Sequence, residues 1–193
     1  MMDDINSEHL EPFRRRTASE AAQRCLVLYT VVAAKRETIR EHLIDWLRQE
    51  MLWEAVSPME AAFLHCELPA GYQAMDVTRY VEALPPLLWA LHHIDNPPVE
   101  TARCDLALIH AALPPLFGAT TEFLSAAMLR DPMEIDEELE RIYQVHWAAR
   151  DAVIHGEMSV SADQLTIIEA RHRALNWLVG YCNQDWDDVS TDT

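Results

Sequence analysis

The sequence is poor in glycine and has no closely paired cysteines, and each shortage argues against a class of protein. Only four of its 193 residues are glycine, too few for the glycine-rich loops that hold phosphate groups in nucleotide-binding enzymes. The four cysteines contain no C-x-x-C pair, which disfavours a zinc ribbon or a redox motif. No apolar run approaches the roughly 18 residues of a membrane span, and no secretory signal is visible at the N-terminus.

Negative charge is what the sequence has in excess. Asp and Glu number 32 against 15 Lys and Arg, so the formal net charge is −17. This balance disfavours nucleic-acid binding, which depends on basic side chains that neutralise phosphates, and it disfavours anionic membrane surfaces. With half of its residues hydrophobic, the chain is expected to form one folded domain, and its scattered cysteines are typical of the reducing cytoplasm.

Helix signals recur along the whole chain. N-terminal capping patterns, in which a small polar residue precedes Glu or Gln by three positions, predict four helix starts, two of them with proline at the first helical position. The four patterns are Thr17–Glu20, Ser57–Glu60, Asp131–Glu134 and Ser161–Gln164. No strand alternation or hairpin signal competes with them, except that residues 26–32 are rich enough in β-branched side chains to resemble a strand.

The predicted architecture is all-α, a single compact bundle of about seven to nine helices. An irregular N-terminal arm spans 1–16, the single all-α domain spans 17–193, and an irregular acidic tail occupies 183–193. Pro85 and Pro86 predict a kink or break near Ala83, because proline removes backbone donors. The expected helices cover 17–35, 37–51, 58–67, 76–94, 101–113, 121–129, 132–156 and 162–180.

Two motifs near the C-terminus carry a family resemblance. Residues 171–181 read R-x-x-A-L-N-W-L-x-G-Y, and residues 186–193 read W-D-D-V-x-T-D-T. The pair resembles the ending of a bacterial family of unknown function, and the similarity extends over roughly 14–193. It implies a compact helical fold and no assigned activity. The residues taken as its structural signature are Trp89, Arg171, Trp177, Trp186, Asp187 and Asp188.

The tail motif has two interpretations. The acids could form a functional carboxylate cluster. The structural alternative, which we favour, buries Trp186 in the bundle while Asp187 and Asp188 cap helices or pair with Arg171 or Arg173. In the same way, Glu82 is expected to form a structural ion pair with Arg79 or Arg171.

The densest run of acids, from Asp131 to Glu140, contains no base. Carboxylates in the first turns of a helix complement its dipole, so a solvated helix start is one interpretation. The other is a recognition face for a basic protein. The partner-binding residues predicted on this basis are Glu134, Asp136, Glu137, Glu138 and Glu140.

No arrangement of residues predicts catalysis. The nine histidines include no H-E-x-x-H motif, so neither a metal site nor a cofactor is expected.

The favoured hypothesis is an acidic cytoplasmic protein that binds another protein, more narrowly an immunity or antitoxin-type inhibitor of a basic bacterial toxin such as a nuclease. The alternatives are an enzyme with a carboxylate or Cys–His site inside the bundle, which a deep pocket with convergent polar groups would favour, and an intracellular scaffold.

Overall fold

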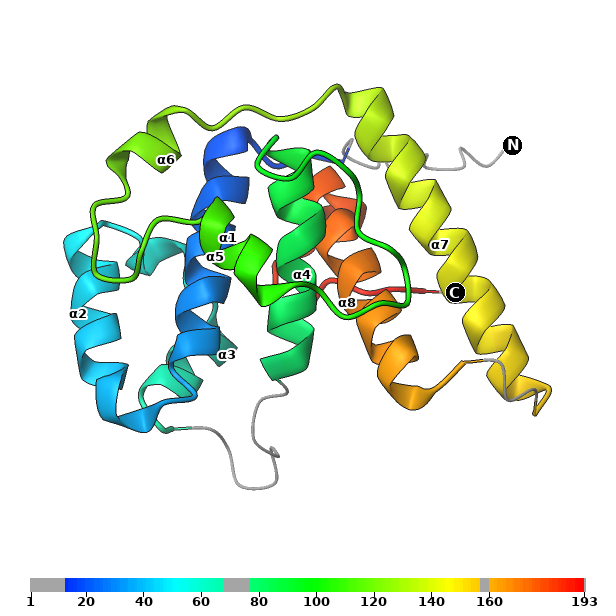
Figure 1. Cartoon of the computed structure of the whole chain (residues 1–193), viewed down its shortest axis with the longest axis horizontal. Helices are drawn as coiled ribbons and strands as arrows, with labels where there is room; N and C mark the ends of the chain where they lie inside the picture. The colour runs from blue at the N-terminus through cyan, green and yellow to red at the C-terminus, as the bar shows by residue number, and fades with distance from the viewer. Residues whose placement is uncertain (1–12, 68–76, 157–159, 193) are drawn as a thin grey trace, which may run out of the picture.

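The computed structural model describes residues 13–67, 77–156 and 160–192, and within them the protein is entirely helical (Figure 1). This confirms the predicted all-α class. Eight α-helices and three short 3-10 helices follow one another along this part of the chain. They are α1 (Ala18–Ala33), η1 (Glu37–Ile39), α2 (Arg40–Gln49), η2 (Trp53–Ala55), α3 (Pro58–Leu64), α4 (Val77–Ala90), α5 (Leu106–Ala112), α6 (Thr121–Ser125), α7 (Pro132–Ile154), α8 (Ala162–Val179) and η3 (Tyr181–Asn183).

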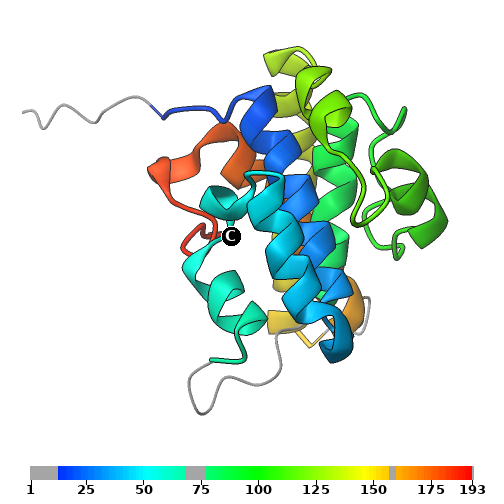
Figure 2. The same cartoon turned by 90° about the vertical axis from the view of Figure 1, so that its left-hand side faces the viewer.

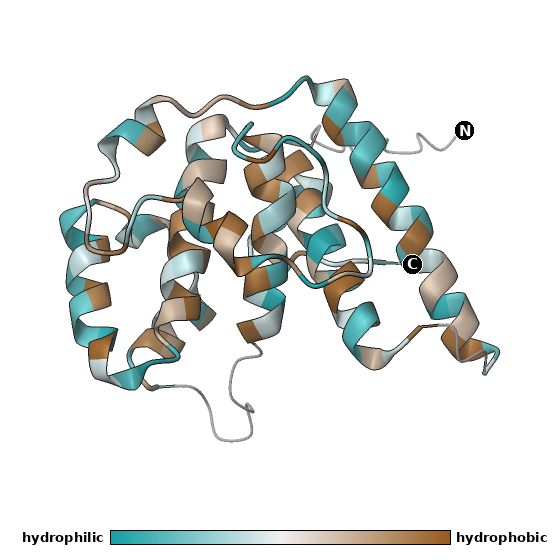
Figure 3. Ribbon diagram, viewed as in Figure 1, coloured by the Kyte–Doolittle hydropathy of each residue, from teal (hydrophilic) through white to brown (hydrophobic). Residues whose placement is uncertain are grey.

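Three helices form the centre of the bundle. α4 packs against both α1 and α8, and α7 packs chiefly against α8 at the edge of the molecule (Figures 1 and 2). The strand-like segment Leu26–Val32 lies inside α1, so the helical interpretation was correct. Its apolar character follows from the central position of α1, because Leu26, Val27 and Leu28 are fully buried. The outward side of α7 is rich in hydrophilic residues over its first half (Figure 3).

The predicted helix starts are confirmed. The side chains of Thr17, Ser57 and Ser161 each accept a hydrogen bond from the backbone N–H three residues later. The backbone N–H of each of the three donates in return to the side chain of that later residue, which completes a capping box. Asp131 caps α7 by accepting from the backbone N–H of Met133. At the other end of α8, Gly180 adopts the left-handed conformation that terminates helices, with φ of 75°.

Several of the expected helices have other bounds in the structure. The helix expected over 101–113 begins only at Leu106, because the preceding backbone serves other partners: the Cys104 N–H donates to Glu82, and the Ala102 carbonyl accepts from Arg171. The helix expected to end near 129 ends at Ser125.

Pro85 and Pro86 do not break their helix. α4 is continuous from Val77 to Ala90 with both prolines inside and buried, so the expected break near Ala83 was wrong. The helix ends four residues earlier than expected, and His92 just beyond it has a positive φ of 63° that cannot continue an α-helix. Asp76, with which this helix was expected to begin, lies outside the described residues.

The described helices include none that is long and apolar enough to cross a membrane.

Candidate functional site

The C-terminal motif residues converge on two tryptophans whose rings are in edge-to-face contact. Trp177, near the end of α8, and Trp186, in the tail, are both buried, and their rings meet edge to face with centroids 5.6 Å apart. The guanidinium of Arg24 from α1 lies over both rings, at 5.5 Å from Trp177 and 4.8 Å from Trp186. Such cation–π contacts fasten the tail to the central helices.

Arg24 belongs to a buried ion pair that the sequence analysis did not anticipate. Its NH1 group donates to both carboxylate oxygens of Glu60, at 2.9 and 2.8 Å, and its NH2 group donates to the Ala55 carbonyl. Glu60 also accepts from the backbone N–H of Ser57. The Nε atom of Arg24 is buried and has no hydrogen-bond partner. The sequence feature that could have predicted this buried ion pair is the position of Arg24, a single arginine in the middle of an apolar helix.

The two tail aspartates have different roles. Asp187 accepts from the Ser57 hydroxyl at 2.6 Å and from the Met59 backbone N–H at 2.9 Å, so it acts as a second cap for α3. The Asp188 side chain is exposed and has no hydrogen-bond or ion-pair partner among the described residues, while its backbone N–H donates to the Asp185 carbonyl. Neither aspartate pairs with Arg171 or Arg173, contrary to one of the expected arrangements, because Arg173 donates to the backbone carbonyl of Trp186 instead.

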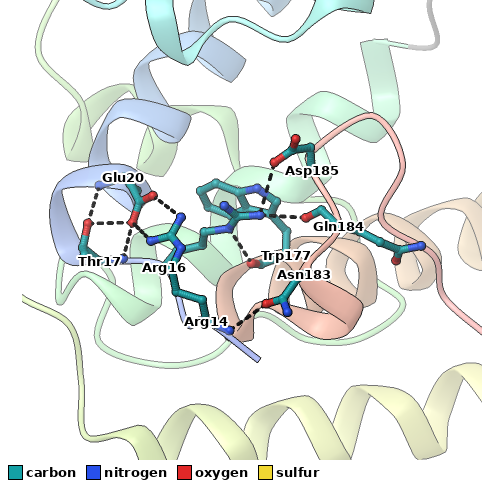
Figure 4. A network of polar contacts seen from close by, with 8 residues as sticks. All are labelled: Arg14, Arg16, Thr17, Glu20, Trp177, Asn183, Gln184 and Asp185. Carbon is teal, nitrogen blue, oxygen red and sulfur yellow. Dashed lines mark hydrogen bonds and ion pairs between the residues drawn. The ribbon is translucent and has the colours of Figure 1, made fainter. Parts of the chain in front are cut away.

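The described residues of the N-terminal arm, 13–16, lie against this region (Figure 4). Arg16 donates to the Gln184 carbonyl at 2.7 Å and stacks on the Trp177 ring at 5.2 Å. Arg14 donates its backbone N–H to Asn183 and its guanidinium to Glu20. The hydrogen bond from Arg14 lowers the pKa of Glu20 to about 2.

A cavity of about 450 Å³ lies between the arm, α1, η2, the start of α3 and the tail. Its volume falls within the range of small-molecule sites. The cavity contains no residue of α7. The charged residues that line it are Arg16, Glu20, Arg24, Glu54, Asp185, Asp187 and Asp188.

The remaining signature residues lie elsewhere. Arg171 pairs with Glu82 at 2.6 Å inside the bundle, which is one of the two ion pairs expected for Glu82. Arg79, the other expected partner, pairs with Glu169 instead. Trp89 is buried at the end of α4, and Arg130 both stacks on its ring and donates to its carbonyl. These contacts connect the C-terminal end of α4 to the segment that immediately precedes α7.

The five predicted partner-binding acids do not form one surface. Glu134, Asp136, Glu137 and Glu140 are exposed, and two of them already have basic neighbours: Glu134 pairs with Arg130 and Asp136 with Arg15. Glu138 is only 6% exposed. It therefore does not belong to an accessible face, because the helical turn directs it inward, where it pairs with Arg141.

Two features that would point to catalysis, a metal cluster and an activated buried thiol, are absent from the described residues. Among them no group of three or more His, Cys, Asp or Glu could hold a metal ion. Burial raises the pKa of the Cys25 thiol, and burial with the nearby Glu82 raises that of Cys104 to about 12. Neither is an activated nucleophile.

One known family model matches nearly the whole length of the chain. The model of a domain of unknown function, DUF4272, matches residues 6–189. The chain belongs to this DUF4272 family. No curated protein and no solved structure matches the chain. For DUF4272, then, this chain shows where the C-terminal residues lie: Trp177, Trp186, Asp187 and Asp188 all line the cavity beneath the N-terminal arm.

Proposed function

We propose that this DUF4272 protein is an acidic cytoplasmic binding protein of the immunity or antitoxin type, which blocks a basic bacterial toxin such as a nuclease. The observation that carries the proposal is the outer face of α7. Met133, Glu137, Glu140 and Trp147 are exposed on α7 at helical spacing, so they follow one side of a helix that packs chiefly against α8 on its other side.

The composition of this face suits a basic partner. Trp147 is 50% exposed and Met133 is 71% exposed, whereas large apolar side chains are normally buried in such a helix. Exposed tryptophan is typical of the centres of protein interfaces. Among the described residues, Glu137 has no ion-pair partner and Glu140 accepts only from the neutral Gln144 amide, so both carboxylates are available to Lys or Arg.

Charge complementarity of this kind acts mainly on the association rate. Carboxylates on an inhibitor attract the basic cleft with which a nuclease binds phosphate, and salt screens that attraction. The proposal therefore requires fast association that slows steeply as ionic strength rises.

The test begins with the product of the neighbouring gene. If co-expression of this chain relieves growth inhibition by that product, the purified pair is then studied by stopped-flow kinetics across a salt series. Charge reversal of Glu137 and Glu140 to lysine should slow association by about tenfold or more. The matched control reverses the exposed Asp45 and Glu122, which lie on α2 and α6. Absence of a complex, or equal rates for both variants, overturns the proposal.

The alternative of an enzyme is favoured by one observation, the cavity with its convergent charged residues. Most of those charges are already occupied, however: Arg24 with Glu60, Glu20 with Arg14, and Asp187 with the start of α3. The described thiols close to buried carboxylates have raised pKa values rather than lowered ones. Binding is therefore better supported than catalysis.

A further inference from the structure

The longest uncharged stretch of the sequence lies at the surface of the protein. Residues 106–121 include no Asp, Glu, Lys or Arg, and at sixteen residues they form the longest such stretch in a chain of net charge −17. The next longest, 83–94, lies largely in the core, since residues 83–91 are all buried. In 106–121, by contrast, only Ile109, Leu113 and Thr120 are buried. Charge is therefore absent from a piece of surface, where the core does not require its absence.

The exposed part of this stretch includes most of α5. Ala107, Leu108 and Ala111 lie on the side of α5 that faces away from the buried Ile109, and Leu106 at its start is 53% exposed. Figure 2 shows α5 at the outer edge of the molecule, beyond α4, and Figure 3 shows that it is mainly apolar. We call Leu106, Ala107, Leu108 and Ala111 the α5 face.

A groove of about 350 Å³ lies beside the α5 face, between α5 and the segment 94–105 that precedes it. Leu108 lines the groove from α5, and Val99, which is 66% exposed, lines it from the preceding segment. Ile94, Pro97 and Pro98 add further apolar lining. This surface therefore offers both a projecting apolar helix and an apolar groove.

Two arginines fix the segment that forms the groove. Arg130 donates to the carbonyl of Ile94, and Arg171 donates to the carbonyls of Val99 and Ala102. These bonds hold the backbone while the Val99 side chain stays in solvent. The groove is thus formed in the free protein, so a partner that occupies it does not have to order this segment.

The lack of charge indicates what covers this surface. A basic partner gains nothing from an uncharged face when the same chain exposes carboxylates on α7. Two copies of this chain, however, repel each other over most of their surfaces, because each has a net charge of −17. An uncharged face is where two copies can meet without opposing carboxylates. At the groove, Arg103 is already paired with Asp163, and Asp105 caps α5.

We propose that the α5 face and this groove form the interface of a symmetric homodimer. In a two-fold dimer the same surface serves both copies, so it must be complementary to itself. The helix and the groove meet this requirement, because the leucines of α5 in each copy enter the groove of the other.

The dimer is separate from the proposed toxin-binding face. Among the described residues, none of α7 lines the groove. Each dimer therefore carries two α7 faces that remain open to a partner. Either proposal can fail alone, because self-association is measured without any toxin.

Sedimentation velocity of the full chain tests the proposal. The dimer should predominate at about 100 μM protein and dissociate on dilution. Its dependence on salt should be the reverse of that expected for the toxin complex. Raising the salt from about 0.05 M to about 0.5 M screens the repulsion between two acidic copies, so the dimer should become tighter.

Charged substitutions locate the interface. Ala107→Glu with Leu108→Glu places acids in the first turn of α5, which the helix dipole tolerates, and should weaken the dimer by about 100-fold or more. The matched control is Met128→Glu with Ile154→Glu, which adds the same two charges at exposed apolar positions outside the groove. The control should dimerise as the wild type does, apart from a small effect of its added charge.

A second variant tests the groove without altering a helix. Val99→Glu leaves the backbone carbonyl that Arg171 binds and should weaken the dimer by about tenfold or more. Circular dichroism confirms that each variant is folded. The proposal is overturned if monomer predominates at about 100 μM protein, or if the dimer weakens as salt rises. It is equally overturned if the two double variants dimerise alike, or if Val99→Glu leaves the dimer unchanged.

Discussion

The Nδ1 atoms of His146 and His172 lie 3.0 Å apart in the buried contact between α7 and α8. One ring must donate and the other accept, so the contact requires at least one neutral imidazole. Burial lowers the pKa of His146, and burial together with His146 lowers that of His172 to about 4. Glu169 and Arg150 act on His146 with opposite sign, and the Tyr143 ring packs edge-on to His172.

Acid should therefore weaken the fold through this pair. An unfolded histidine takes up a proton near pH 6.5, whereas folded His172 resists protonation until about pH 4, and the pKa of His146 is also lowered. The stability from the neutral pair is complete above the unfolded pKa and is lost as the pH falls through this window, by roughly 2–4 kcal/mol in total. Urea unfolding of the wild type and of His146→Phe with His172→Leu, at pH 7 and at pH 4.5, checks this. Equal losses for both proteins would contradict it.

The close approach of the arm to Gly180 makes a second prediction. A Cβ at this position would lie 2.1 Å from the Arg14 carbonyl oxygen, and the left-handed φ disfavours any side chain. Gly180→Ala should lower the free energy of unfolding by about 2 kcal/mol or more. Gly156 has a similar φ of 73° but open space around it, so Gly156→Ala should cost only about 1 kcal/mol. Similar losses measured by urea denaturation would argue against the close approach.

The capping role of Asp187 makes a third prediction. Asp187→Ala removes two hydrogen bonds at the start of α3 and should cost about 1–2 kcal/mol. The side chain of its neighbour Asp188 is exposed and has no polar partner among the described residues, so Asp188→Ala should change stability by less than about 0.5 kcal/mol. Thermal denaturation of the two variants distinguishes them. A loss at Asp188 as large as that at Asp187 would refute the assignment of the cap.

Burial of the tail tryptophan makes a fourth prediction. Trp186 is 4% exposed and packs on Trp177, so Trp186→Ala should destabilise the protein by roughly 3 kcal/mol. Trp147→Ala serves as the control, because that ring is half exposed on α7 and should matter much less for folding. The two melting temperatures decide the matter, and an unchanged value for Trp186→Ala would exclude docking of the tail.

The features of the fold that could be predicted from the sequence are those that depend on residues close together in the chain. The capping box of Ser57 and Glu60 involves residues three apart, so it could be recognised without knowing the rest of the chain. The pairing of Glu60 with Arg24 joins residues 36 positions apart and depends on how α1 and α3 pack. The cavity, formed by segments from both ends of the chain, could not be predicted for the same reason.

The burial of Glu138 could have been predicted from the helical periodicity of the sequence. Ile135 and Ile142 are both buried, so they mark the inner side of α7. Glu138 lies three residues after one and four before the other, which places it on that stripe. Grouping it with its acidic neighbours by proximity in sequence ignored the helical turn. Its burial beside Arg141 is what the periodicity of the same helix implies.

The hydrogen bonds that connect Arg14 and Arg16 to residues 178–184 also bear on the order in which the protein forms. They join positions separated by more than 160 residues, and contacts between such distant positions form slowly. On the ribosome, α1 emerges long before the segment against which its first turn is held. The arm, the tail and the space between them must therefore assemble as the final step of folding, after residue 186 has been synthesised.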